Sequence, residues 1–210
     1  MVYDKAMQEK MSNNFYLIGI DEAGRGPLAG PVAVGAVCVA IDDEDFKIFS
    51  HGVRDSKLLS AKQREEWFQK ILLQTQKGKF SFSAAFSSAD MIDTEGLTNA
   101  IRHALASALS KLKCKPEDTL ILLDGGLRAP KRYPNQITII RGDDIQPIIS
   151  FASIAAKVLR DKKMIALAKK YPEYGFERHK GYGTREHYEM IAKHGILEGI
   201  HRKSFLGIVE

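Results

Sequence analysis

Two adjacent carboxylates, Asp21 and Glu22, follow a run of strand-forming residues at 15–20 and precede the turn Gly24-Arg25-Gly26. Side chains alternate across a strand, so we expect the two acids on opposite faces of a sheet. A carboxylate is costly to bury unless it is paired, hydrogen-bonded or bound to a metal ion. Glycine lets backbone amides approach a ligand closely, and arginine offers a positive charge to a phosphate. The stretch is therefore either an ordinary polar turn at a strand end or part of a phosphate-handling site.

A third carboxylate stands in a similar place. Four consecutive aliphatic residues at 120–123 are typical of a strand that is buried on both faces, and Asp124 ends this strand. Gly125 and Gly126 follow it. A carboxylate at the C-terminal edge of a buried strand is a common way for α/β sheets to present a catalytic acid. The alternative is an aspartate that only caps the turn.

A fourth carboxylate, Asp161, belongs to a helix predicted over residues 145–170. Three further polar residues precede it at steps of three, four and four, and they line the same helix face: Ser150, Ser153 and Lys157. Taken alone, such a stripe indicates a face that is exposed to solvent.

Cations and an aromatic ring alternate with glycines between residues 174 and 184. Arg178, His179 and Lys180 stand beside Tyr182. A nucleic-acid surface needs a ring to lie against a sugar or base and charges for the phosphates. An ordinary structured loop has a similar composition, so these residues alone favour neither interpretation.

The composition is that of a globular protein with one substantial core. The chain has 210 residues, of which 44% are hydrophobic and 27% charged, and its net charge of +5 modestly favours an anionic partner. Cys38 and Cys114 form neither a zinc cluster nor a disulfide framework, so we expect free thiols in a reducing, cytoplasmic compartment. Residues 1–14 contain no long apolar stretch, which argues against a signal peptide or a membrane anchor.

Hydrophobic periodicity and turn residues predict the strands and helices that carry these residues. Strands are predicted at 15–20, 31–41, 80–86, 119–124 and 137–140, and helices at 61–76, from 93 towards Pro116, at 145–170 and at 185–194. Ser60, Thr94 and Thr184 are the expected N-caps of three of these helices. The acidic run at 42–45 lacks the glycine spacing of a metal loop and is interpreted as a solvated turn.

Four motifs resemble those of one enzyme family, in the family's order. Asp21-Glu-Ala-Gly-Arg-Gly-Pro-Leu-Ala-Gly-Pro-Val32 resembles the signature opening of type 2 ribonuclease H, specifically the bacterial ribonuclease HII branch. The other matching motifs are Asp55-Ser-Lys57, Ala156-Lys-Val-Leu-Arg-Asp161 and His179-Lys-Gly-Tyr-Gly-Thr184. His201-Arg-Lys-Ser-Phe205 also resembles the family's closing motif, so the resemblance spans roughly residues 15–206. Phe151 stands where the family carries a small residue.

The resemblance implies a catalytic and metal-binding set of four acids: Asp21, Glu22, Asp124 and Asp161. If these acids converge, their mutual repulsion demands cations. Hard oxygen ligands favour Mg²⁺ or Mn²⁺ over Zn²⁺, and sequential acids with diverging side chains suit two ions. The implied substrate-binding residues are Gly24, Arg25, Gly26, Lys57 and Tyr182. By resemblance, the glycine loop holds the ribose 2′-OH, Lys57 lies near the substrate backbone, and Tyr182 packs on the following sugar.

The expected activity is that of an endoribonuclease. It would cleave the RNA strand of RNA–DNA hybrids and cut on the 5′ side of a single ribonucleotide in duplex DNA, leaving 5′-phosphate and 3′-hydroxyl ends. One alternative is another two-metal nuclease or an integrase-like enzyme on the same fold, which would share the acids but not the other motifs. The second is a non-catalytic RNA–DNA hybrid-binding protein with structural acids, which is disfavoured because carboxylates repel phosphates unless metal ions intervene.

The expected fold is an α/β, ribonuclease H-like mixed sheet flanked by helices. We expect a flexible tail at 1–14 and a single catalytic domain at 15–210, within which about 170–210 form a small helical C-terminal extension. The expected protein is a monomer that binds hybrid and ribonucleotide-containing duplexes and does not bind a membrane.

Overall fold

The computed structural model describes residues 15–41, 43, 46, 49–50, 53 and 59–207. The predicted N-terminal tail at 1–14 lies outside the described residues, as do Asp55-Ser56-Lys57 and most of the acidic run at 42–45. The predicted phosphate contact of Lys57 therefore remains a prediction.

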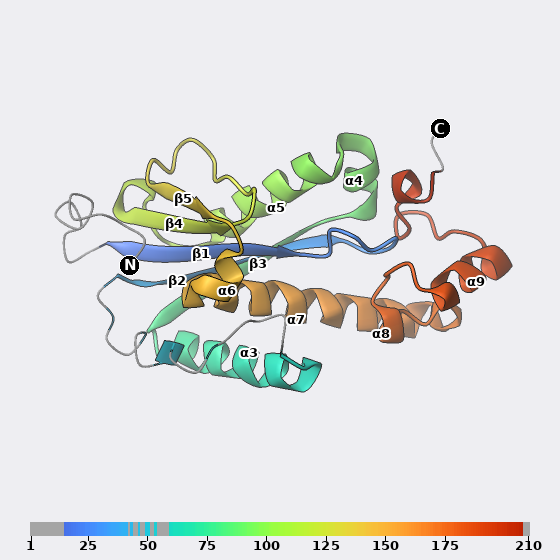
Figure 1. Cartoon of the computed structure of the whole chain (residues 1–210), viewed down its shortest axis with the longest axis horizontal. Coiled ribbons are helices and arrows are strands. Elements are labelled where there is room, and N and C mark those ends of the chain that lie inside the picture. The colour runs from blue at the N-terminus through green and yellow to red at the C-terminus, as the bar shows by residue number, and fades with distance from the viewer. Residues whose placement is uncertain are drawn as a thin grey trace.

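A five-stranded mixed sheet forms the centre of the protein, in the order β3-β2-β1-β4-β5 (Figure 1). The strands are β1 (Tyr16–Ala23), β2 (Val32–Ala40), β3 (Phe80–Ser87), β4 (Thr119–Asp124) and β5 (Gln136–Ile139). β1, β2 and β3 pair antiparallel, whereas β4 runs parallel to both β1 and β5. All five predicted strands are present, and the mixed sheet confirms the expected fold class.

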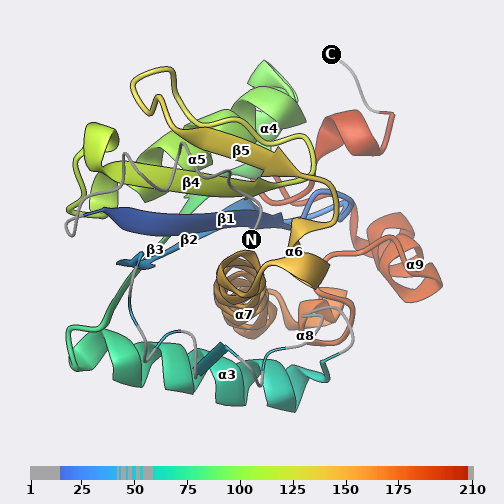
Figure 2. The same ribbon diagram turned by 60° about the vertical axis from the view of Figure 1, so that its left-hand side comes forward.

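Helices cover both faces of the sheet. α4 (Ala89–Glu95) and α5 (Leu97–Lys111) lie on one face, and α7 (Pro147–Lys170) lies on the other, directly against β1 and β2. α3 (Ala61–Gln76) packs outside α7, as the end-on view of α7 in Figure 2 shows. Further helices are α6 (Gly142–Ile145), α8 (Phe176–His179), α9 (Arg185–His194) and the 3₁₀ turns Pro116–Asp118, Pro172–Tyr174 and Lys203–Phe205.

The alternation of β1 sends its side chains into two separate cores. Ile18 and Ile20 pack in the core beneath α5, whereas Leu17 packs in the core beneath α7. Because the period is two, Asp21 continues the α7 side and Glu22 the α5 side, as the sequence predicts. A third, smaller core joins the end of α7 to the C-terminal extension.

Two glycines let α7 approach the sheet at backbone contact. A Cβ atom at Gly19 would lie 2.2 Å from the carbonyl oxygen of Ile148, and one at Gly35 would lie 2.3 Å from that of Ala152. No side chain fits at such distances, so these positions set the depth at which α7 sits on β1 and β2. Phe151, the departure from the family pattern, is fully buried among aromatic rings and does not touch the acids.

The predicted N-caps Ser60 and Thr184 are confirmed, since each side chain accepts a hydrogen bond from the third backbone N–H of its helix. The prediction for Thr94 is wrong. Ser88 caps α4 earlier in the chain, and Gly96, at φ 80°, then separates α4 from α5. A second cap and a left-handed glycine thus divide what the sequence predicts as one helix.

The long helix α7 begins at Pro147, two residues later than predicted. Gln146 is extended at φ −113° and ψ 111°, the conformation that a following proline favours, and the preceding residues form the separate short helix α6. α5 likewise ends at Lys111, before Pro116.

Both cysteines are free thiols, as predicted, and their Sγ atoms lie 3.1 Å apart. Within the described part of the chain, no helix is both long and apolar enough to cross a bilayer.

Gly35→Ala is expected to lower the free energy of unfolding by about 1–3 kcal/mol, because the added methyl group must push α7 away from β2. Gly126→Ala is the matched control, since a Cβ atom there would meet nothing within 4 Å. Urea unfolding of the two variants checks this. Equal stability losses would contradict the close packing of α7.

Candidate active site

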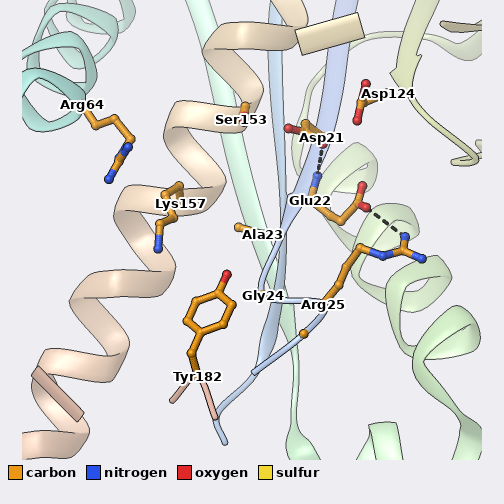
Figure 3. A pocket seen from close by; sticks show the side chains of 11 residues that line it. Asp21, Glu22, Ala23, Gly24, Arg25, Arg64, Asp124, Ser153, Lys157 and Tyr182 are labelled. Atoms are coloured by element: carbon orange, nitrogen blue, oxygen red, sulfur yellow. Dashed lines mark hydrogen bonds and ion pairs between the residues drawn. The ribbon is translucent and has the colours of Figure 1, made fainter. Parts of the chain in front are cut away.

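A cavity of about 480 Å³ opens where β1 and β4 end and α7 passes beside them (Figure 3). It is lined by Asp21, Glu22, Ala23, Gly24, Arg25, Gly26, Arg64, Asp124, Ser153, Lys157 and Tyr182. The strand-end acids, the glycine turn and the tyrosine, far apart in the sequence, therefore share one cavity.

Parallel pairing of β1 with β4 brings two of the acids together. Ile20 pairs with Leu123, and each is followed directly by an aspartate, Asp21 and Asp124. The Asp124 Oδ1 atom accepts a hydrogen bond of 2.6 Å from the backbone N–H of Gly142. Both interpretations of Asp124 therefore apply, since its Oδ1 caps a turn and its side chain also lines the cavity.

Asp21 is 5% exposed and lies among like charges. Burial raises its pKa well above the usual range, and the neighbouring carboxylate of Glu22 raises it further. Hydrogen bonds from the Ser153 hydroxyl and from the Glu22 N–H, at 2.7 Å to Oδ1, act in the opposite direction. The ionised form of Asp21 therefore lacks sufficient positive charge nearby.

Glu22 is only partly compensated. Burial raises its pKa, and the Arg25 guanidinium, whose Nη1 lies 2.9 Å from Oε1, opposes that rise. Its second oxygen, Oε2, is buried and has no hydrogen-bond partner within the described structure. A buried carboxylate oxygen without a donor is the kind of atom that a cation satisfies.

Asp161 stands apart from the other three acids. Its Oδ1 lies 2.7 Å from the Nζ of Lys157, and Asp161 does not line the cavity. The structure thus brings Asp21, Glu22 and Asp124 into one cavity and holds Asp161 in an ion pair with Lys157, one turn earlier on α7. No three acidic, histidine or cysteine side chains in the described ranges are gathered closely enough to form a ready-made ion site.

The three converging acids fit hard divalent cations. They offer carboxylate oxygens only, and no cysteine or histidine lines the cavity. A cation would supply the charge that buried Asp21 lacks and a partner for Oε2 of Glu22.

The glycine turn and the tyrosine form neighbouring parts of the cavity wall (Figure 3). Gly24 has φ 91°, and a Cβ atom there would lie 2.0 Å from Nε of Arg160, so only glycine fits. Tyr182 is 43% exposed, and its ring reaches to 4.0 Å from the position of a Cβ atom on Gly26. The predicted substrate-binding residues that the structure describes therefore lie side by side.

Three polar side chains line the cavity although the sequence analysis did not assign them to the site: Arg64, Ser153 and Lys157. The sequence could have indicated Ser153 and Lys157, since they lie on the same face of the predicted helix as Asp161. Nothing in the sequence indicates Arg64, because it reaches the cavity from α3 through the packing of α3 on α7.

A profile of one protein family, described as Ribonuclease HII, matches residues 18–207. The chain belongs to the ribonuclease HII family. It is 44% identical to "Ribonuclease HII" of Caldicellulosiruptor bescii over 202 residues, covering 95% of this chain and 92% of that protein. The resemblance inferred from the motifs is thereby confirmed.

Solved structures share the fold. The ribonuclease H2 of Pyrococcus horikoshii superposes with a TM-score of 0.71 at 27% identity, covering 90% of this chain and 93% of the other. Bst-RNase HIII in complex with Mn²⁺ superposes with a TM-score of 0.66 at 17% identity, over 95% and 70% of the two chains.

Family membership makes the chain an endoribonuclease, a hydrolase that acts on nucleic acid in a family that depends on divalent metal ions. It also decides against the alternative of a non-catalytic hybrid-binding protein. The family's activity is directed at the RNA of RNA–DNA hybrids.

Asp21→Asn is expected to stabilise the protein in the presence of a chelator, because it removes a buried, repelled charge. The gain should be on the order of 1 kcal/mol, the usual size of a single-substitution effect on stability. Mg²⁺ or Mn²⁺ should then raise the melting temperature of the wild type more than that of the variant. The exposed residue Asp90 supplies the control, Asp90→Asn. Lower stability of metal-free Asp21→Asn would contradict the charge imbalance.

Proposed function

We propose that the enzyme cuts duplex DNA on the 5′ side of a single embedded ribonucleotide, in addition to acting on RNA–DNA hybrids. One observation carries the proposal: three of the four acids, the glycine turn and Tyr182 line the same cavity. Chemistry at a phosphate and recognition of the neighbouring sugar therefore take place at one point.

Recognition of the ribose rests on the glycine turn, because only the 2′-OH distinguishes RNA from DNA at a given nucleotide. Gly24-Arg25-Gly26 offers backbone groups at the cavity wall, and Gly26 has no Cβ atom that would hold a sugar away. The ring of Tyr182 is placed to pack on the next sugar. Lys157 Nζ and the Arg160 guanidinium, both on α7, lie 5.9 and 6.0 Å from that ring and place positive charge near it.

Four acids would hold the catalytic cations. Asp21, Glu22 and Asp124 already converge, and Asp161 becomes available when its ion pair with Lys157 opens. When bound, two divalent cations supply Lewis-acid stabilisation of the attacking and leaving oxygens in an in-line displacement at phosphorus. The freed Lys157 ammonium and Arg64 then face the phosphate backbone from the α7 side of the cavity.

Hydrolysis of this kind is expected to leave 5′-phosphate and 3′-hydroxyl ends, because water attacks phosphorus and the 3′ oxygen departs. Mass spectrometry of the fragments cut from an RNA–DNA hybrid identifies the ends. A 2′,3′-cyclic phosphate would contradict the mechanism, since that product requires the ribose 2′-OH as the nucleophile.

Tyr182→Ala is expected to reduce cutting at a single ribonucleotide roughly tenfold or more, since packing on an aromatic ring is worth about 1–3 kcal/mol. Cutting of a long hybrid should fall less, because neighbouring ribonucleotides offer alternative registers. kcat/KM on both substrates is the measurement, with Tyr188→Ala as the control, an exposed tyrosine that does not line the cavity. Equal losses on both substrates would contradict the role of Tyr182.

A further inference from the structure

Two consecutive residues of the C-terminal extension, His201 and Arg202, are buried. They lie behind two segments proposed to recognise the substrate, residues 24–30 with the glycine turn and residues 181–187 with Tyr182. His201 forms an isolated β-bridge with Ala29, and the Arg202 N–H donates to the Leu28 carbonyl at 2.8 Å. The sequence places this pair in the family's closing motif without assigning it any role.

The guanidinium of Arg202 binds the glycine turn from behind. Its nitrogens donate to the carbonyl oxygens of Gly24 at 2.8 Å, Arg25 at 3.0 Å and Gly30 at 2.9 and 3.0 Å. No carboxylate in the part of the chain that the structure describes forms an ion pair with it. Burial lowers the pKa of Arg202 to about 9, which still leaves it charged at neutral pH. A fully buried cation without an ion pair is a costly arrangement, which the carbonyl groups and the Phe205 ring, 5.1 Å from the guanidinium, offset only in part.

These hydrogen bonds fix the direction of two peptide planes. The peptides are trans, so the N–H of each peptide points away from its carbonyl. Because Arg202 draws in the carbonyls of Gly24 and Arg25, the N–H groups of Arg25 and Gly26 must point away from it, towards the cavity that these residues line. Neither N–H has a partner within the described ranges. Arg202 therefore presents two backbone donors to a ligand.

His201 acts on the other recognition segment through a second histidine. The Leu197 N–H donates to His201 Nδ1 at 2.8 Å, so neutral His201 carries its proton on Nε2. That proton points to Nε2 of His187 at 3.1 Å, which places the His187 proton on Nδ1. Nδ1–H of His187 then donates to the Tyr182 carbonyl at 2.9 Å. Each tautomer follows from the previous bond, so the direction of the chain is unique.

Both histidines stay neutral near pH 7. Burial lowers the pKa of His187, and burial together with His187 lowers the pKa of His201 to about 4. The Tyr182 carbonyl also accepts the Thr184 N–H at 2.8 Å, so its peptide plane is held from two sides. The backbone that carries the Tyr182 ring is thereby fixed relative to His201.

We propose that His201-Arg202 is a positioning pair that sets the spacing between the glycine turn and Tyr182. Arg202 orients the donors of the turn, His201 orients Tyr182, and the single peptide between them keeps the two segments in register. The inference rests on the proposed function, in which the glycine turn recognises a ribose and Tyr182 packs on the next sugar. Ordinary packing does not explain the pair, because an apolar side chain would fill the space without burying a charge.

The first test is a double-mutant cycle on a duplex with one ribonucleotide. His201→Gln should lower kcat/KM roughly tenfold, the effect of one misaligned hydrogen bond. In a Tyr182→Ala background, His201→Gln should lower kcat/KM little further, because the ring through which His201 acts on the substrate is absent. His103→Gln, at an exposed histidine of α5, is the control. The same fold-loss in both backgrounds would overturn the proposal.

The second test needs no cleavage. Arg202→Lys should accelerate amide hydrogen exchange in residues 24–30, and His201→Gln in residues 181–187, while α5 keeps its wild-type protection. Arg132→Lys, at an exposed arginine outside both segments, is the control. Unchanged exchange in both segments would overturn the positioning role. If α5 also loses protection, the variant has unfolded globally and the cycle at His201 decides.

The two tests also separate this inference from the proposed function. A wild-type enzyme that cuts hybrids but ignores a single ribonucleotide would refute the proposed function alone. Faster exchange in the two segments would then still support the pair, and unchanged exchange would still refute it.

Discussion

The depth at which α7 packs on the sheet is the constraint on which the site depends. Gly19 and Gly35 remove the side chains that would separate α7 from β1 and β2, so helix and strand backbones touch. That contact brings the polar stripe of α7 beside the end of β1, where Asp21 accepts a hydrogen bond from Ser153. A stripe that would otherwise face solvent thus becomes one wall of the cavity.

The charge distribution in the cavity follows from this packing. Asp21 and Glu22 are buried by different faces of the same strand end, and the available cations compensate them only in part. Arg25 is committed to Glu22, and Lys157 to Asp161. Divalent ions bound at these acids, as proposed, would complete the balance and would turn an anionic cavity into one that can accept a phosphate. We therefore expect the metal-free protein to be least stable at the proposed site of the chemistry.

The sequence predicts local features well because their causes are local. The period of β1 places Asp21 and Glu22 on opposite faces, and the aliphatic run before Asp124 indicates its buried strand. The prediction that Thr94 is an N-cap is wrong because Ser88, an equally local signal, caps the helix earlier in the chain. The role of Arg202 was beyond prediction, because its partners lie up to 178 residues away and are backbone carbonyls, which leave no trace in residue types. The resemblance supplied the four acids as a set, but not the ion pair that holds Asp161 apart.

We propose that the acids with their divalent cations, and the residues that recognise the ribose, act on the same phosphodiester group. The most direct measurement maps the cut in a DNA duplex that contains one ribonucleotide, with Mg²⁺ or Mn²⁺ and with a chelator. The account predicts a single incision on the 5′ side of the ribonucleotide that needs the metal, disappears in Asp124→Asn and is absent from an all-DNA duplex. Cutting at any other position, or cutting that survives chelation, would contradict it.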